Sequence, residues 1–255
     1  MSDGPESMEA EFDTVAKWTA NVAAELDPAC RIPAGCRGSG GPGAMRWLLD
    51  HLGPEPGQVF LDCGGGMGGP AAFVAHEMGV RPLLTDPELD ACAAARSLFG
   101  LAALRAGTRL PVATGAITVG WSLGVLSTVN DQPAFLAEIR RVLRPDARFG
   151  LLVYCAADST NFSVKPPDGN NFPTARALAD LLDQACLQVR HSAWIDDFAA
   201  FPPDWEKTVA DVQSRLERRH GDDVRWQQAQ EQSSRMGALL EADEVRGHLL
   251  VLQPI

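Results

Sequence analysis

The sequence predicts an α/β protein with a doubly wound, mostly parallel sheet of seven strands. Three observations lead to this prediction. Short apolar runs without period-two alternation recur along the chain, as expected for strands that are covered on both faces. Segments with helical spacing of apolar residues separate these runs. A glycine-rich turn joins the first run to a helical segment, FLDCGGGMGGPAAFVAHEM at 60–78, as in the first strand–turn–helix unit of such sheets.

Residues 1–54 are expected to form a helical segment that precedes the sheet. Apolar side chains recur at helical spacing over residues 7–26, which predicts an amphipathic helix. The stretch at 31–44 is rich in glycine and is expected to be a loop. A short helix is predicted after it, over 45–53.

Residues 55–200 are expected to form the core, in which strands and helices alternate. The predicted strands cover 58–63, 81–85, 101–105, 117–122, 147–155 and 187–194. The predicted helices cover 70–79, 88–99, 132–143 and 173–186. Asp131 is expected to begin the third of these helices and Pro145 to end it.

The pattern changes after residue 200, where two helical stretches precede a last strand over 244–255. We interpret residues 201–243 as a helical cap over the carboxyl edge of the sheet, where ligands bind in open α/β folds. Its Trp and Met side chains suit the wall of a small-molecule pocket. Plain packing helices are the alternative, and periodicity does not separate the two.

Composition narrows the class of function. The chain has 33 acidic and 22 basic residues and a net charge of −11, which disfavours nucleic-acid partners. There is no run of eighteen apolar residues, so no membrane span is expected. The six cysteines are scattered and the N-terminus is acidic, so we expect a cytoplasmic protein without a metal site. A small-molecule substrate fits this composition, and a homodimer is left open.

The glycine-rich turn fits two cofactor fingerprints. Its spacing satisfies both the GxGxxG pattern of dinucleotide-binding proteins and the GxGxG pattern of S-adenosylmethionine (SAM) sites. Asp62 precedes the turn, and its carboxylate would repel a pyrophosphate but attract the ammonium and sulfonium of SAM. We therefore expect SAM as the cofactor. The glycines assigned to it are Gly64, Gly65, Gly66 and Gly68.

Four stretches of the chain carry a family resemblance. They are LDCGGGMGGP (61–70), LLTDPELDACAAAR (83–96), and WSLGVL (121–126) with RVLRP (141–145), which lie within 110–154. Over roughly residues 40–195 the chain resembles the class I SAM-dependent methyltransferases, particularly the small-molecule branch that includes ubiquinone and sterol methyltransferases. The resemblance implies a Rossmann-like methyltransferase fold and methyl transfer to a small, largely apolar metabolite.

The resemblance also implies further cofactor residues. Asp86 ends the second predicted strand, where its carboxylate can accept hydrogen bonds from ribose hydroxyls, and Pro87 keeps it at the strand tip. A helix-capping role for Asp86 is compatible with this. Ser122 and Leu123 close the fourth strand at the ligand edge. The remaining candidates are Leu110 for the adenine ring, or else for the core, and Arg37 for the methionyl carboxylate, or else for solvent.

The chain departs from the family at three places. Ala106 and Gly107 stand where an Asp usually contacts the adenine amine, so backbone atoms are expected to replace that contact. Thr118 replaces a common acid, and Ser127 and Thr128 replace paired histidines. Two alternatives to methyl transfer therefore stay open. One is a SAM-binding enzyme that catalyses a cyclisation or rearrangement, and the other is an inactive SAM-binding partner subunit.

No motif identifies the catalytic residues. Methyl transfer requires alignment of the acceptor, exclusion of water and, for some acceptors, removal of a proton. The candidates are Tyr154 and Asp158, at and after the end of the fifth strand, and His191 on the sixth. Ordinary strand and core roles remain the alternative for His191 and Tyr154.

Overall fold

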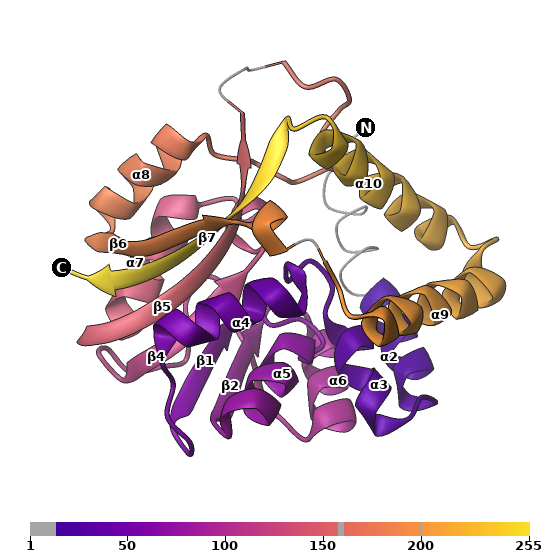
Figure 1. The fold of residues 1–255 in the computed structure, drawn as a ribbon, viewed down its shortest axis with the longest axis horizontal. Coiled ribbons are helices and arrows are strands. Elements are labelled where there is room, and N and C mark those ends of the chain that lie inside the picture. Colours follow the sequence, from indigo (N-terminus) through magenta and orange to yellow (C-terminus); the bar gives the residue numbers. More distant parts are fainter. Residues whose placement is uncertain (1–13, 158–160, 199) are drawn as a thin grey trace.

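The structure, a computed structural model, describes residues 14–157, 161–198 and 200–255 (Figure 1). In this part of the chain seven strands form one sheet in the order β3-β2-β1-β4-β5-β7-β6. All neighbours are parallel except β7, which is antiparallel to both β5 and β6. The strands are β1 (Val59–Cys63), β2 (Arg81–Asp86), β3 (Ala102–Arg105), β4 (Ile117–Leu123), β5 (Leu143–Ala156), β6 (Leu187–Trp194) and β7 (Val245–Pro254). The predicted fold class is confirmed.

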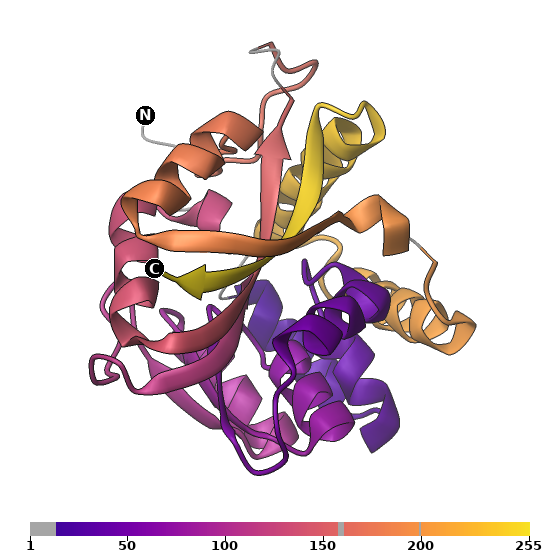
Figure 2. The same ribbon diagram turned by 60° about the vertical axis from the view of Figure 1, so that its left-hand side comes forward.

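Helices cover both faces of the sheet, which explains why its strands read as unbroken apolar runs. One face packs against α4 (Gly41–Leu52), α5 (Gly69–Met78) and α6 (Leu89–Phe99), and the other against α7 (Gln132–Val142) and α8 (Ala175–Gln184). Figure 2 shows the two groups on opposite sides of the strands. Phe60 and Leu61 are neighbours in β1 and point to opposite faces of the sheet. Both are fully buried because helices cover both faces.

The strand order places a topological switch point between β1 and β4. From β1 the chain builds outward to β2 and β3, then returns to the other side of β1 to form β4. The connections that leave the carboxyl ends of β1 and β4 therefore run in opposite directions and leave a crevice between them. The glycine-rich turn at 64–68 lies at this crevice.

The boundary between α7 and β5 differs from the prediction. Asp131 caps α7 by accepting a hydrogen bond from the Ala134 N–H, as expected. The helix ends at Val142, however, and β5 begins at Leu143, before Pro145. The pairing of β4 with β5 shifts register just there, so Pro145 lies in a bulge where no ladder N–H is needed.

The glycine-rich stretch at 31–44 is mostly helical, so the predicted loop is wrong over most of its length. Helix α3 spans Pro28–Gly35 and α4 begins at Gly41, which leaves only residues 36–40 as a loop. A Cβ atom on Gly41 would lie 2.1 Å from Cε1 of Phe201, and one on Gly43 would lie 3.2 Å from Cβ of Phe198. These glycines serve close helix packing, which composition does not distinguish from a loop.

The N-terminal helices pack against the cap. Helix α2 (Val15–Ala24) is the described part of the helix predicted over 7–26, and residues 7–13 lie outside the described residues. The segment that we interpret as a cap contains α9 (Pro203–His220) and α10 (Val224–Glu241), which stand beside the sheet in Figure 1. Trp18 of α2 stacks on His220 of α9, with ring centroids 3.9 Å apart. Trp226 of α10 is buried in the same apolar cluster.

The cap lies next to the carboxyl end of β5. The chain leaves α10 and enters β7 at Val245, which pairs with Ala156, the last residue of β5. Two short 3₁₀ turns, η2 (Leu126–Thr128) and η3 (Ile195–Phe198), follow β4 and β6 on this side. Among the described residues, no helix is both long and apolar enough to cross a bilayer.

Candidate functional site

The turn after β1 requires glycine at its closest approaches. The N–H groups of Gly64 and Gly65 both donate to the Thr85 carbonyl, at 2.7 and 3.2 Å, which holds the turn against β2. Gly64 has φ +75°, and a Cβ there would lie 2.4 Å from Cγ2 of Val125. At Gly66 a Cβ would meet no atom within 4 Å. The turn is therefore packed on its inner side and open at Gly66, the side available to a ligand.

Asp62 lies directly beneath this turn and is 1 % exposed. Burial raises the pKa of Asp62 to about 7; the nearby indole of Trp121, which stands opposite Asp62 in β4, opposes the rise, and the charge of Asp86 adds to it. In the described part of the chain its Oδ2 atom has no hydrogen-bond partner. A buried carboxylate is stable only beside a donor or a cation, so this position suits an ammonium or sulfonium group.

Asp86 joins the end of β2 to the glycine turn. Its Oδ2 accepts a hydrogen bond from the Gly66 N–H at 2.8 Å, and its Oδ1 accepts one from the Glu88 N–H at 2.9 Å. Each carboxylate oxygen can accept a second hydrogen bond, so ribose hydroxyls could bind here as well. Pro87 is exposed at the strand tip, and its carbonyl accepts from Nε of Arg105 at 2.9 Å.

The segment after β3 lies beside Asp86. The Ala106 N–H donates to the Asp86 carbonyl at 2.9 Å, so the two predicted cofactor positions are adjacent. Gly107 is exposed, whereas Ala106 and Leu110 are buried in the core cluster that contains Leu61. The structure thus favours the core alternative for Leu110, and the exposed part of this segment begins at Gly107, next to Asp86.

The two residues at the end of β4 differ in role. Ser122 is fully buried, and its hydroxyl donates to the Cys63 carbonyl at 2.8 Å, which ties β4 to β1. Leu123 is half-buried and packs against the cluster beneath α4. Gly124 follows at the crevice, where a Cβ would lie 2.9 Å from the Gly38 carbonyl oxygen. The loop at 36–40 therefore crosses the carboxyl end of β4.

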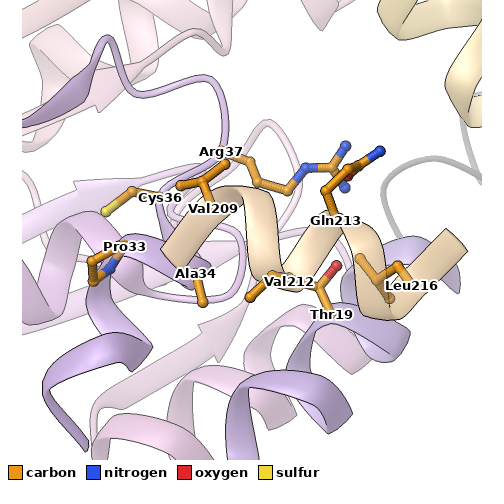
Figure 3. A pocket seen from close by; sticks show the side chains of 9 residues that line it. All are labelled: Thr19, Pro33, Ala34, Cys36, Arg37, Val209, Val212, Gln213 and Leu216. Carbon is orange, nitrogen blue, oxygen red and sulfur yellow. The ribbon is translucent and has the colours of Figure 1, made fainter. Parts of the chain in front are cut away.

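Arg37 belongs to this crossing loop but extends away from the glycine turn. Its side chain is exposed and reaches along α9 toward Gln213 (Figure 3). It lines a pocket of about 60 Å³ between α9 and the N-terminal helices, far smaller than the several hundred Å³ that a nucleoside ligand requires. This pocket is therefore not the cofactor site, and the assignment of Arg37 to the methionyl carboxylate stays a prediction.

The three catalytic candidates are not gathered at one place. Tyr154 lies in the carboxyl half of β5 with its Cε2 3.6 Å from a Cβ placed on Gly124, at the crevice. His191 is exposed on the edge strand β6 and contacts His51, with ring centroids 4.5 Å apart. The His51 carbonyl accepts a hydrogen bond from Arg148, and Arg148 pairs with Val119 in the amino-terminal half of β4. His51, which His191 contacts, thus lies near the end of the sheet opposite the crevice. His191 is therefore away from the crevice, and Asp158 lies outside the described residues.

Burial determines the chemistry available to Tyr154. It raises the pKa of Tyr154 to about 12, so the hydroxyl stays protonated at neutral pH. Beside it lie Phe172 and Met236, which belong to an apolar cluster between β5 and α10. Tyr154 can donate a hydrogen bond from an apolar wall, but it is a poor base.

Sequence reasoning missed two buried polar groups at the crevice. The Ser39 hydroxyl and the Trp121 indole nitrogen are buried and have no hydrogen-bond partner among the described residues. Ser39 lies beside Cys36, whose pKa is raised by burial and by the charge of Asp62. A glycine-rich stretch gave no signal for Ser39, and Trp121 is part of an apolar run.

Part of the chain matches a known protein family. Residues 61–151 match a family described as a methyltransferase domain. This stretch is about a third of the chain. The predicted resemblance to SAM-dependent methyltransferases is thereby confirmed, and the matched segment runs from β1 into β5. The comparison with curated proteins gives no match.

Solved structures share the fold of this chain at low sequence identity. The cyclopropane synthase MmaA2 from Mycobacterium tuberculosis has a TM-score of 0.71 and 12% identity over 99% of this chain and 100% of its own. The [4+2]-cyclase SpnF has a TM-score of 0.65 and 19% identity over 82% and 79%. Geranyl diphosphate C-methyltransferase from Streptomyces coelicolor A3(2), crystallised with S-adenosyl-L-homocysteine, has a TM-score of 0.57 and 12% identity over 83% and 78%.

Proposed function

We propose that this methyltransferase domain binds SAM at the glycine turn and methylates a small, largely apolar metabolite beneath the cap. The observation that supports this most directly is the Asp62 carboxylate, which is buried under the turn with one oxygen unpaired. A pyrophosphate would worsen the electrostatics of this position, whereas the cationic end of SAM improves them. The structural neighbours that contain SAM or its product agree with this cofactor.

The cofactor residues divide by the part of SAM that they would hold. Asp62 faces the ammonium, and the backbone of Gly64 through Gly68 lies along the methionyl group and the sugar. Asp86 accepts from the ribose hydroxyls, and the backbone at 106–107 contacts the adenine edge. For Ser122, Leu123, Leu110 and Arg37 the contacts seen favour structural roles, so their assignment to the cofactor stays a prediction.

When bound, SAM supplies a methyl carbon activated by an adjacent sulfonium. The protein's residues then align the acceptor and exclude water. The cluster of Tyr154, Phe172 and Met236 provides an apolar wall next to Gly124, at the mouth of the crevice. A protonated Tyr154 orients an acceptor oxygen or nitrogen by donating to it. It does not remove the acceptor's proton at neutral pH.

A second candidate function is a SAM-dependent cyclisation or rearrangement without methyl transfer. It is favoured by the placement of the candidate bases, because Tyr154 stays protonated and His191 lies away from the crevice. A pericyclic or rearrangement step needs orientation and electrostatics more than a base. An inactive partner subunit is the third possibility, for which the structure offers no specific support.

One experiment separates these functions. The purified protein is incubated with methyl-labelled SAM and fractions of apolar metabolites, and both label transfer and S-adenosylhomocysteine are measured. Methyl transfer predicts equal amounts of methylated product and S-adenosylhomocysteine. Product formed without S-adenosylhomocysteine indicates the second function. Failure to bind SAM in calorimetry would contradict both.

Three further expectations belong to this proposal. The division into residues 1–54, 55–200, 201–243 and 244–255 treats the cap as a lid on the core. A cytoplasmic location is supported by six free cysteines. The acidic charge supports a small-molecule substrate without nucleic-acid partners, and sedimentation would decide whether the protein is a homodimer.

A further inference from the structure

The segment 106–116 connects β3 to β4 without a helix or strand of its own. Its backbone groups must therefore find partners elsewhere, because irregular segments have no internal ladder of hydrogen bonds. Two charged side chains at the end of α7, Glu138 and Arg141, supply many of these partners.

Glu138 and Arg141 hold the loop at three alternate positions, Leu110, Val112 and Thr114. Oε1 of Glu138 accepts from the Leu110 N–H at 2.7 Å. Arg141 donates through Nη2 to the carbonyls of Leu110, at 3.2 Å, and Val112, at 2.9 Å. It also donates through Nη1 to the Thr114 hydroxyl at 3.1 Å. Both backbone polar groups of Leu110 are satisfied by this pair.

The two side chains also fix each other. Arg141 donates through Nε to Oε2 of Glu138 at 2.7 Å and through Nη2 to Oε1 at 2.6 Å. The side chain of Arg141 is 24% exposed and that of Glu138 is 11% exposed. The Arg141 guanidinium holds the pKa of Glu138 below its usual value despite partial burial. A bidentate pair of this kind is rigid in a way that a surface ion pair is not.

The other end of the loop meets the cofactor residues. The Ala106 N–H donates to the Asp86 carbonyl, and Ala106 and Leu110 are packed in the same core cluster. Neither Ala106 nor Gly107 has a side chain that can form a hydrogen bond. Recognition of a purine edge here depends on where the backbone lies, and that position is set by the attachment of the loop to α7.

We propose that Glu138 and Arg141 are positioning residues that hold the 106–114 loop so that its backbone recognises the amine of the cofactor's adenine. This inference rests on the proposed function, since it requires SAM at the glycine turn. It assigns the adenine selectivity of the domain to a charged pair that touches the loop and not the base. Substitutions should therefore weaken cofactor selectivity more than the chemical step.

The test compares two ligands that differ only at the base. S-adenosylhomocysteine carries the adenine amine, and S-inosylhomocysteine carries an oxygen in its place. Calorimetry measures both affinities for the parent protein, Arg141→Met and Glu138→Gln. Arg144→Met is the matched control, because Arg144 is exposed and pairs only with the exposed Asp146 in the described residues.

We expect the parent and Arg144→Met to prefer S-adenosylhomocysteine. Arg141→Met should lose about tenfold in affinity for it, the upper end of the effect of one neutral hydrogen bond, and little for the inosine analogue. The KM for SAM should rise by a similar factor, with kcat changed less than threefold. Equal losses for both ligands, or none, would overturn the inference.

Two further outcomes remain interpretable. If Arg141→Met does not fold, Glu138→Gln and Arg141→Lys decide. Glu138→Gln keeps the size of the side chain and removes its charge, and Arg141→Lys keeps the positive charge and removes the planar fork of donors. Loss of selectivity in these variants supports the inference, and unchanged selectivity overturns it. If the parent protein binds neither ligand, the proposed cofactor itself is wrong. A parent that binds both ligands without preference overturns the inference about adenine selectivity and leaves the proposed cofactor standing.

Discussion

Asp62→Asn should make the ligand-free protein more stable at alkaline pH while it weakens the binding of SAM. The pKa of Asp62 is raised from 3.8 to about 7 by burial, so the folded protein holds a proton there that the unfolded chain releases. Between these two values the native state binds more protons, and the free energy of unfolding falls as pH rises. Stability attributable to this proton is complete below pH 3.8 and absent above pH 7.

The magnitude follows from the distance between the two pKa values. A difference of about three pH units at 1.36 kcal/mol per unit gives a cost of about 4 kcal/mol for ionised Asp62 at pH 8.5. An Asn side chain has the same shape and no charge, so it avoids this cost. Proteins commonly sacrifice stability at binding sites in this way.

Urea unfolding of the parent and Asp62→Asn at pH 5 and pH 8.5 measures the effect. The variant should gain about 3 kcal/mol relative to the parent on going from pH 5 to pH 8.5, because the part of the cost that develops between pH 3.8 and pH 5 is already present at pH 5. The affinity for SAM should rise with pH through about 7 in the parent and stay flat in the variant. A stability difference that does not change with pH would refute the argument that Asp62 is a buried, unpaired carboxylate.

Three other predictions concern the turn, the acceptor wall and the cap. Gly64→Ala should lower the melting temperature and abolish SAM binding in calorimetry. A φ of +75° costs alanine about 1–2 kcal/mol, and the added Cβ would contact Val125. Binding of SAM at parental affinity would contradict this prediction. Tyr154→Phe should keep kcat within about tenfold and leave the pH profile unchanged up to pH 9, since the hydroxyl does not ionise there; loss of a basic limb near neutral pH would show that it does. Trp226→Phe should lower the free energy of unfolding, measured in urea, by about 1–3 kcal/mol. The reason is that the indole N–H of the buried Trp226 donates to Glu217 at 2.5 Å. The control Val224→Ala, on the exposed face of α10, should change the free energy of unfolding little.

Local sequence patterns predicted the core elements well. The alternation of apolar runs and helical segments located all seven strands, because burial on both faces leaves a direct mark on composition. The glycine turn was also predictable, since positive φ at Gly64 and Gly68 is a local requirement of the backbone. Asp62 and Asp86 could be placed because the ends of parallel strands meet at one edge of the sheet.

Predictions failed where a residue's partner is distant in the chain. Gly41 and Gly43 suggested a loop, but they admit Phe201 and Phe198 against a helix. Arg37 reaches along α9, and its assignment to the methionyl carboxylate stays a prediction. His191 lies on the expected strand but beside His51, away from the crevice, and its catalytic assignment stays a prediction too.

The sequence by itself determined the sheet, the glycine turn and the acids at the ends of β1 and β2, because each depends on backbone conformation or on a repeating pattern of burial. Glu138 and Arg141 are three residues apart, and this spacing by itself suggests an ordinary ion pair on a helix surface. Only the tertiary structure shows that the pair binds the loop that follows β3 and begins beside Asp86. Periodicity reveals which face of a helix is covered. It does not reveal what covers it, because that depends on how segments far apart in the chain come together.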